Sequence, residues 1–276
     1  MSEQFCDVGR GITLCYESFG DPSDPPALLV MGLGTQMLAW HADFCTRLAE
    51  RGLHVVRFDN RDIGRSTHLS SPPPTIAQLL RRSRGTAAYT LADMAEDTAG
   101  LIRELEISPA HVIGASMGGM IAQTLAARHP ERVRSLVSIM SNTGSRIWGQ
   151  PSLRTYAVLL RRAPSGRDAY IAHIERVFAA IIASGNRAAE LRRITAPTLV
   201  VHGKADPLVA YSGGRATARL IPGAKLMSVE GMGHDLPRAI WPRLIDAIAA
   251  LASRADEDRG YDSSPQAPRS RSLSGL

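Results

Sequence analysis

The stretch His111-Val-Ile-Gly-Ala-Ser-Met-Gly-Gly119 decides how this chain folds. It begins with apolar, β-branched residues typical of a strand buried on both faces of a sheet, and the pattern over Met117–Arg128 predicts a helix directly after it. Ser116 therefore lies at a sharp turn, between Gly114 and Gly118. Glycines there remove the side chains that would collide where strand and helix pass closely. This pattern predicts a serine in strained backbone geometry with an exposed hydroxyl group.

The turn at Ser116 allows two interpretations. It could be a glycine-rich turn that only needs small residues. It could also present a nucleophile, because the N-terminus of the following helix offers free N–H groups and the positive end of its dipole to a developing oxyanion. The buried strand before Ser116 and the helix after it favour the nucleophile.

A serine hydroxyl is a poor nucleophile without a base, and the base is expected to be a histidine that follows its acid along the chain. His234, in Gly231-Met-Gly-His-Asp235, comes after the last predicted strand, at an edge where open α/β sheets bind ligands. His202 also ends a strand, but it precedes the acid and is predicted to be a structural hydrogen-bonding residue. Packing or surface roles are predicted for the other histidines: His41, His54, His68, His111, His129 and His173.

Asp206 is the predicted acid, because it follows the strand that ends near His202. The alternative position is the end of the preceding strand, where Ser138–Gly144 contains no carboxylate. Asp235 adjoins His234, but chain neighbours seldom reach the imidazole in the required geometry. The alternative for Asp206 is a plain turn residue.

Two N–H donors are expected to bind the oxyanion of an acyl-transfer reaction. One is the backbone N–H of Met117, directly after the serine. The second is expected in the loop Met31-Gly-Leu-Gly34, where glycines let the backbone approach a ligand closely. Leu33 and Met117 are therefore the predicted donors.

Short β-branched runs alternate with longer helical periods, the pattern of a mostly parallel sheet flanked by helices. The predicted strands are Ile12–Phe19, Ala27–Met31, Leu53–Phe58, His111–Ala115, Val133–Met140, Pro197–His202 and Lys225–Val229. The predicted helices are Gln36–Arg51 (with Gly52 as its C′ residue), a helix from a capping box at Thr90–Asp93 to about Glu106, Met117–Arg128 and Arg238–Ala252.

The chain divides into a core, an insertion and a tail. Residues 142–196 are helical in pattern and lie between two sheet strands, which predicts a cap over one end of the sheet. Residues 1–141 and 197–254 form the predicted core. Residues 255–276 are polar and rich in Ser, Pro and Arg, which predicts a disordered tail.

Composition excludes several classes of protein. Of 276 residues, 44% are hydrophobic, enough for a sizeable core. The net charge of +6 is carried almost wholly by scattered arginines and only 5% of residues are aromatic, which argues against a nucleic-acid groove. The few cysteines (Cys6, Cys15 and Cys45) have no metal-binding spacing and predict no disulfide scaffold. No apolar run approaches the roughly 20 residues of a membrane helix, and the N-terminus has no signal-peptide pattern, so a cytoplasmic location is predicted.

The motifs, taken in order, resemble the α/β-hydrolase superfamily in its esterase/lipase branch. The resemblance covers about residues 10–252. Within the superfamily, the chain is similar to aclacinomycin methylesterase and to actinobacterial esterases. It rests on the segments Leu29–Gly34, Phe58–Ser66, Gly114–Gly119, Val201–Asp206 and Gly231–His234. One departure is a cap some tens of residues shorter than in these relatives, which predicts a more open site.

The resemblance implies an α/β-hydrolase fold with a mostly parallel eight-stranded sheet. It implies no cofactor and no metal. It assigns the nucleophile to Ser116, its partners to Asp206 and His234, and the oxyanion donors to Leu33 and Met117. A motif that braces the loop near the oxyanion site is matched by Asp62, Gly64 and Ser66.

The resulting hypothesis is a serine hydrolase of the carboxylesterase or methylesterase type, which cleaves carboxylic esters through an acyl-enzyme on Ser116, His234 and Asp206. Lactone or thioester hydrolysis, acyl transfer and cofactor-free haloperoxidase chemistry use the same residues and stay open as alternatives. A binding protein without turnover is a further alternative, since a short cap could disable the pocket. Lipase activity at a lipid interface is ranked below methyl or short-chain esterase activity, and the oligomeric state is not predicted.

Overall fold

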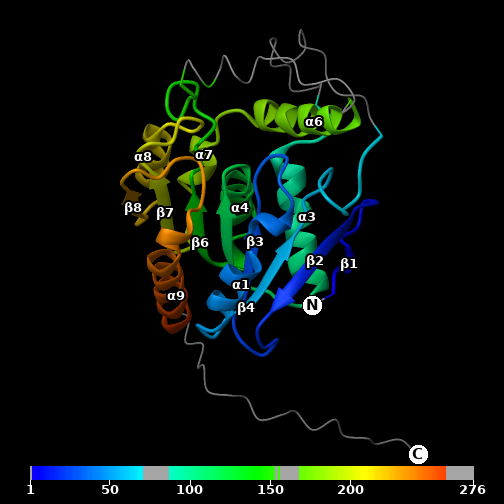
Figure 1. The fold of residues 1–276 in the computed structure, drawn as a ribbon, viewed down its shortest axis with the longest axis vertical. Coiled ribbons are helices and arrows are strands. Elements are labelled where there is room, and N and C mark those ends of the chain that lie inside the picture. The colour runs from blue at the N-terminus through cyan, green and yellow to red at the C-terminus, as the bar shows by residue number, and fades with distance from the viewer. Residues whose placement is uncertain (1, 71–86, 153–154, 156–167, 259–276) are drawn as a thin grey trace, which may run out of the picture.

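A computed structural model describes residues 2–70, 87–152, 155 and 168–258 of the chain. In this part of the chain, eight strands form one sheet in the order β1-β2-β4-β3-β5-β6-β7-β8 (Figure 1). Strand β2 pairs antiparallel with both β1 and β4, and the remaining pairs are parallel. The strands are β1 Gln4–Asp7, β2 Thr13–Phe19, β3 Pro26–Val30, β4 His54–Phe58, β5 Ala110–Ala115, β6 Val133–Ile139, β7 Thr198–Gly203 and β8 Lys225–Val229.

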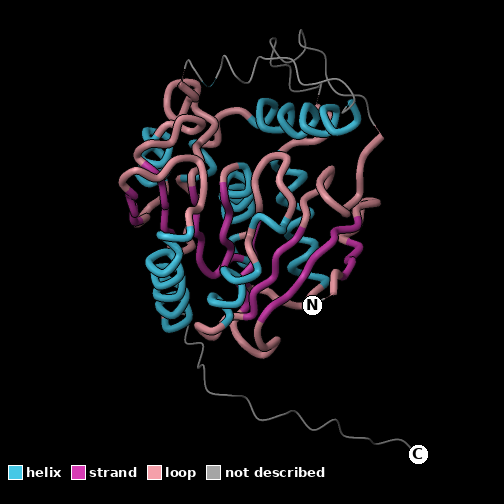
Figure 2. The backbone as a smooth tube through the Cα atoms, in the orientation of Figure 1, coloured by secondary structure: helices cyan, strands magenta, loops and turns pink. Residues whose placement is uncertain are grey.

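Helices cover both faces of this sheet, as the tube in Figure 2 shows. Helices α1 and α9 pack on one face, and α3, α4 and the end of α8 pack on the other. The described α-helices are α1 Ala42–Ala49, α3 Leu91–Glu104, α4 Met117–Arg128, α6 Asp168–Ser184, α7 Ala188–Leu191, α8 Tyr211–Leu220 and α9 Trp241–Glu257. Short 3₁₀ turns are η1 Met37–Ala39, η2 Pro130–Arg132 and η3 Arg238–Ile240. The α/β-hydrolase arrangement predicted from the sequence is thereby confirmed.

The central strands serve both hydrophobic cores, because successive side chains of a strand point to opposite faces. In β3, Leu28 and Val30 join the core under α3 and α4, whereas Ala27 and Leu29 join the core under α1 and α9. All four side chains are fully buried. Burial on both faces explains the unbroken apolar run that predicted this strand.

Two elements differ from the sequence prediction near the N-terminus. Strand β1 was not predicted, because Cys6 is its one buried residue and the strand lies at the sheet edge. The predicted helix Gln36–Arg51 is divided into η1 and α1. The division falls at Trp40, which is buried against Phe44, and His41 then caps α1 by accepting a hydrogen bond from the Asp43 N–H at 3.2 Å.

The closing helix runs further than predicted and corrects the boundary of the tail. Helix α9 continues to Glu257, so residues 255–257 are helical rather than part of a tail. Ala255 is buried, and Asp256 accepts a hydrogen bond from Arg134 at 2.9 Å, which explains the extension. Residues 259–276 and the Ser71–Pro74 segment lie outside the described residues.

The described part of the 142–196 segment contains helices α6 and α7 and no strand. Figure 1 shows α6 at the top of the view across the end of α3, and the Leu91 N–H of α3 donates to Ser184 Oγ of α6 at 2.9 Å. Arg187 joins the two ends of the segment, since its backbone N–H donates to Thr143 O at 2.8 Å and its Nη2 to Asn142 O at 2.6 Å. Burial lowers the pKa of Arg187 to about 10.

Candidate active site

Ser116 adopts the strained turn that the glycine pattern predicts. Its φ and ψ are 56° and −120°, in the region that favours glycine. A Cβ on Gly114 would lie 2.2 Å from Gly118 O, and one on Gly118 would lie 2.1 Å from Val30 O. Only glycine therefore lets β5 and α4 approach each other and β3 closely enough to form this turn.

The strain at Ser116 leads to a stability prediction. Ser116→Gly is expected to be more stable than Ser116→Ala by roughly 1 kcal/mol, because glycine adopts this φ without steric cost and alanine does not. In an ordinary strand or helix the alanine variant would be the more stable of the two, because glycine loses more conformational entropy on folding than alanine does. Urea unfolding of the two variants measures the difference directly. An alanine variant as stable as the glycine variant would show that the turn stores no strain.

Ser116, His234 and Asp206 form one chain of hydrogen-bond contacts. The Oγ atom of Ser116 lies 2.9 Å from Nε2 of His234, and Nδ1 of the same ring lies 2.8 Å from Oδ2 of Asp206. The Asp206 side chain is fully buried, whereas 16% of the His234 side chain is exposed. The structure thus brings together the three residues that the sequence singled out, from the ends of β5, β7 and β8.

The environment of Asp206 favours its ionised form. Burial alone would raise the pKa of this carboxyl group, but the N–H groups of His202 and His234 outweigh burial and hold the pKa well below its usual value. Oδ1 accepts further hydrogen bonds from the backbone N–H groups of Leu208 at 2.9 Å and Val209 at 2.8 Å. An ionised Asp206 accepts a hydrogen bond from the Nδ1–H group of His234 and so keeps the ring proton on Nδ1. Nε2 is then unprotonated and can accept the proton of Ser116.

The loop that holds Leu33 lies directly against the nucleophile. A Cβ on Gly32 would lie 3.0 Å from Ser116 Cβ and 3.5 Å from its Oγ, so this position also needs a small residue. Met117 is the first residue of α4. Within the described residues, neither the Leu33 N–H nor the Met117 N–H donates a hydrogen bond to the protein. Met117 therefore adjoins Ser116 directly, and Leu33 adjoins Gly32, which lies against Ser116.

Two residues that the sequence interpretation missed brace this loop. Asp59 accepts hydrogen bonds from the backbone N–H of Met37 at 2.7 Å and of Arg65 at 3.0 Å. Asn60 donates from Nδ2 to Met31 O at 2.9 Å. The available signal was a buried strand followed by an Asp-Asn pair, whose short polar side chains commonly satisfy nearby backbone groups.

The predicted bracing residues Gly64 and Ser66 act on Asp59 rather than on the oxyanion loop itself. A Cβ on Gly64 would overlap the Asp59 carboxylate at 1.9 Å, and Ser66 Oγ donates to Asp59 O at 2.6 Å. Ser66 Oγ also accepts from the Cys15 N–H at 2.9 Å. The structure therefore supports a bracing role for this motif through Asp59.

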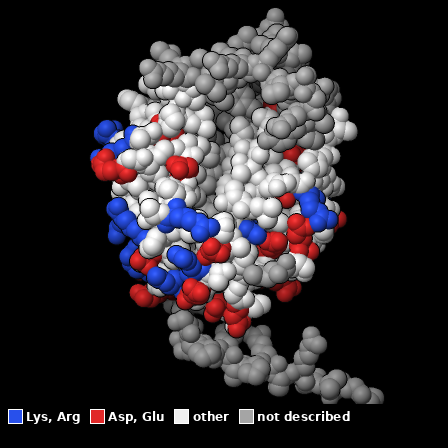
Figure 3. All heavy atoms as spheres, in the orientation of Figure 1, with Lys and Arg blue, Asp and Glu red and all other residues white. Residues whose placement is uncertain are grey.

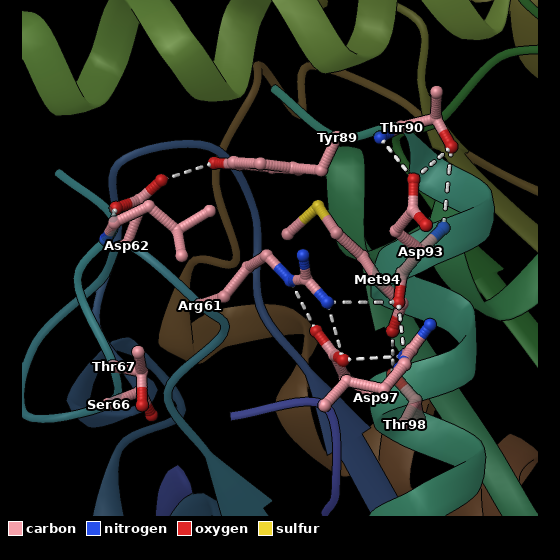
Figure 4. Close-up of polar contacts among 12 residues, drawn as sticks. Arg61, Asp62, Ser66, Thr67, Tyr89, Thr90, Asp93, Met94, Asp97 and Thr98 are labelled. Carbon is pink, nitrogen blue, oxygen red and sulfur yellow. Dashed lines mark hydrogen bonds and ion pairs between the residues drawn. The ribbon is translucent and has the colours of Figure 1, made fainter. Parts of the chain in front are cut away.

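Asp62 has different partners, which link the loop after β4 to Tyr89 (Figure 4) and to helix α6. Tyr89 donates its hydroxyl proton to Asp62 Oδ2 at 2.8 Å, and Arg176 of α6 lies 3.2 Å from Oδ1. Next to it, Arg61 forms a bidentate ion pair with Asp97 of α3 and lies over the Tyr89 ring. These buried charged groups hold the loop after β4 against α3 and α6.

The described residues show no metal centre and no disulfide. No group of three or more His, Cys, Asp or Glu side chains in the described ranges could hold a metal ion. The three cysteines, all within these ranges, are buried and unpaired, and burial raises the pKa of the Cys45 thiol to about 12. None of the helices in the described part of the chain is long and apolar enough to span a bilayer.

Surface charge on the face in Figure 3 is mixed. Lys and Arg side chains are interspersed with Asp and Glu over the lower half of this face, and mostly uncharged residues lie above them. A single-sign patch of the kind that follows a nucleic-acid backbone is therefore absent from the described residues of this face.

Comparison with known protein families shows to which family this chain belongs. A family model described as alpha/beta hydrolase fold matches residues 25–169, more than half of the chain. The chain belongs to the α/β-hydrolase family. A second model, described as TAP-like protein, matches residues 181–239, which include Asp206 and His234.

Three proteins illustrate what this chain is similar to. It is 28% identical to the rhodomycin D methylesterase DauP of Streptomyces sp. strain C5, with 87% of this chain and 94% of the relative covered. It is 27% identical to the rhodomycin D methylesterase DnrP of Streptomyces peucetius, with the same coverage. A hydrolase from Pseudomonas aeruginosa PA01 superposes with a TM-score of 0.66 at 25% identity and covers 92% of this chain and 97% of its own.

Proposed function

We propose that this chain is a serine hydrolase that cleaves carboxylic esters of small molecules. The observation that carries the proposal is the contact chain from Ser116 Oγ through His234 to the buried Asp206 carboxylate, with donor–acceptor distances of 2.9 and 2.8 Å. A serine hydroxyl is a poor nucleophile by itself, and this series of contacts supplies the base that it needs, a histidine in the correct tautomer. A cytoplasmic location remains a prediction from the sequence alone.

The proposed mechanism uses these groups in two half-reactions. In the first, His234 Nε2 accepts the Ser116 proton while Oγ attacks the ester carbonyl, and the N–H groups of Leu33 and Met117 stabilise the oxyanion. Collapse of the tetrahedral intermediate expels the alcohol, which takes the proton from His234. In the second, His234 activates water, which attacks the acyl-enzyme and releases the carboxylic acid with Ser116 restored.

Methyl esters are the proposed substrate class within this reaction. The support is the similarity, over most of the chain, to two proteins named rhodomycin D methylesterases. At this level of identity the acid portion of the ester is not carried over from these relatives. Lipase activity ranks lower.

A product assay separates the proposal from its alternatives. The purified chain is incubated with methyl, butyl and octyl esters of one carboxylic acid, a lactone and a thioester, with and without added alcohol or thiol. We expect methanol and free acid as the main products, with the methyl ester cleaved fastest. Acyl transfer to the added acceptor, or faster turnover of the lactone or thioester, would replace the proposal with one of those activities. Saturable binding without any turnover would indicate a binding protein.

A further inference from the structure

A second imidazole lies against the acid of the site. His202, the penultimate residue of β7, is fully buried. Its Nε2 atom lies 2.8 Å from Val209 O and 3.5 Å from Asp206 Oδ2, the carboxylate oxygen that also contacts His234. Two histidines therefore converge on one oxygen of Asp206, although only His234 reaches the nucleophile.

The partners of His202 determine where its proton lies. Val209 O and the carboxylate of Asp206 can only accept hydrogen bonds, so Nε2 must be the donor. Nδ1 has no hydrogen-bond partner within the described residues, which agrees with a tautomer that leaves this nitrogen unprotonated. The N–H of His202 thus points between the carbonyl and the carboxylate, with the carbonyl as its nearer acceptor.

Helix α8 fixes the plane of this ring. A Cβ on Gly214 would lie 2.4 Å from His202 Nδ1, so the ring rests directly on the helix backbone. Tyr211 packs edge-on against it, with ring centroids 6.1 Å apart at an angle of 67°. The ring is therefore held by packing on one side and by its hydrogen bond on the other.

His202 also closes the loop that carries Asp206. Val209 donates its N–H to Asp206 Oδ1 at 2.8 Å and accepts the N–H of His202 at its carbonyl. Without His202, Val209 O would lose its partner in a buried position, and Oδ2 of Asp206 would keep His234 as its only imidazole contact. Both losses allow the carboxylate to rotate away from His234.

We infer that His202 is a positioning residue that fixes the Asp206 carboxylate toward His234. The inference rests on the proposed function in one respect, that Asp206 orients His234 as the base for Ser116. His202 touches neither the substrate nor the reacting atoms. Its effect is expected in turnover rather than in substrate binding.

A nearly isosteric pair of variants tests this role. His202→Gln keeps an N–H donor at about the place of Nε2, and His202→Met fills similar space without a donor. We expect kcat to fall about 10- to 100-fold in His202→Met, with KM within about twofold of wild type, because a small displacement of a catalytic group has an effect of this size. His202→Gln is expected to restore kcat to within about threefold of wild type.

The matched control is a buried histidine remote from the site. His111 of β5 is also buried and contacts Ser135 Oγ at 2.9 Å. His111→Gln and His111→Met are expected to change thermal stability and to leave kcat unchanged. An equal loss of kcat in His111→Met and His202→Met would overturn the inference, since it would reflect general loosening of the core.

Gly214→Ala covers the case in which His202→Met does not fold. The added methyl group displaces the intact ring, while alanine suits the helix better than glycine. We expect kcat to fall with KM unchanged in a variant that still unfolds cooperatively. Unchanged kcat in this variant, or equal kcat in His202→Gln and His202→Met, would contradict the positioning role.

A proton NMR measurement separates this inference from the proposed function. The proton between His234 Nδ1 and Asp206 is expected to give a far-downfield resonance in wild type and His202→Gln, and to shift upfield or disappear in His202→Met. If no ester is hydrolysed, the proposed function fails, but this resonance still tests the position of Asp206. A resonance identical in wild type and His202→Met would overturn the inference whatever the activity.

Discussion

Ser116→Ala is expected to lower kcat for ester hydrolysis by at least about 10⁵-fold, because loss of the nucleophile removes the acyl-enzyme route altogether. The residual rate would come from the oxyanion donors and substrate binding. The alanine side chain keeps the Cβ of serine and removes only the Oγ atom, so the substitution deletes the nucleophile with the smallest change of shape. Steady-state kinetics with a methyl ester measures the effect.

The control for this variant is a fully buried serine with a structural role. Ser138→Ala removes a buried hydroxyl group that accepts a hydrogen bond from Gln123 at 2.9 Å. It is expected to lower stability by about 1 kcal/mol and to leave kcat within a few-fold of wild type. A Ser116→Ala enzyme with more than about one-tenth of wild-type kcat would mean that hydrolysis proceeds without this nucleophile.

Asp206→Asn is expected to lower kcat by about 10⁴-fold through a change of histidine tautomer. Two backbone N–H groups face Oδ1, so the amide oxygen of asparagine must occupy that position. The amide NH₂ then faces His234 Nδ1, which must accept a hydrogen bond, and the ring proton moves to Nε2. His234 can no longer accept the proton of Ser116. The same NH₂ also faces the N–H of His202, which disfavours the geometry further.

Asp235→Asn is the matched control for this prediction. Asp235 is the chain neighbour of His234 and the rival acid in the sequence, yet the Nδ1 contact of His234 is to Asp206. We expect kcat of Asp235→Asn within a few-fold of wild type. The reverse result, with Asp235→Asn inactive and Asp206→Asn active, would show that Asp235 rather than Asp206 is the acid that orients His234.

The predicted site residues could be found in the sequence because each follows directly from a strand. Ser116, Asp206 and His234 come after β5, β7 and β8, whose parallel carboxyl ends share one edge of the sheet. The turn at Ser116 is further specified by glycines whose replacement would collide with the backbone. Local patterns of this kind can be interpreted from the sequence without knowing which distant residues will come into contact.

The bracing contacts could not be predicted, because they depend on groups far apart in the sequence. Asp59 binds the backbone N–H of Met37, 22 positions away, and Asn60 binds the carbonyl of Met31, 29 positions away. Almost every residue has the same backbone N–H and C=O groups, so the sequence does not indicate which of them a side chain will contact. His202 was correctly predicted to form a structural hydrogen bond, but its approach to Asp206 depends on how the loop to Val209 turns back.

The edges of elements were missed for the same physical reason. Strand β1 has Cys6 as its one buried residue and is defined by its antiparallel pairing with β2 rather than by an apolar run. The extra turn of α9 depends on Asp256, whose charged side chain suggested a tail but is held by Arg134 of β6. Tertiary contacts outweigh composition at such boundaries.

Fluorophosphonate labelling of the purified protein, wild type beside Ser116→Ala, tests the central claim most directly. The probe reacts only with a serine that a neighbouring base has activated, and it requires no knowledge of the natural ester. We expect stoichiometric labelling of wild type at Ser116, located by peptide mass spectrometry, and none of Ser116→Ala. A folded wild-type protein that remains unlabelled, or a Ser116→Ala protein that is labelled equally, would contradict the proposal that Ser116 is the activated nucleophile.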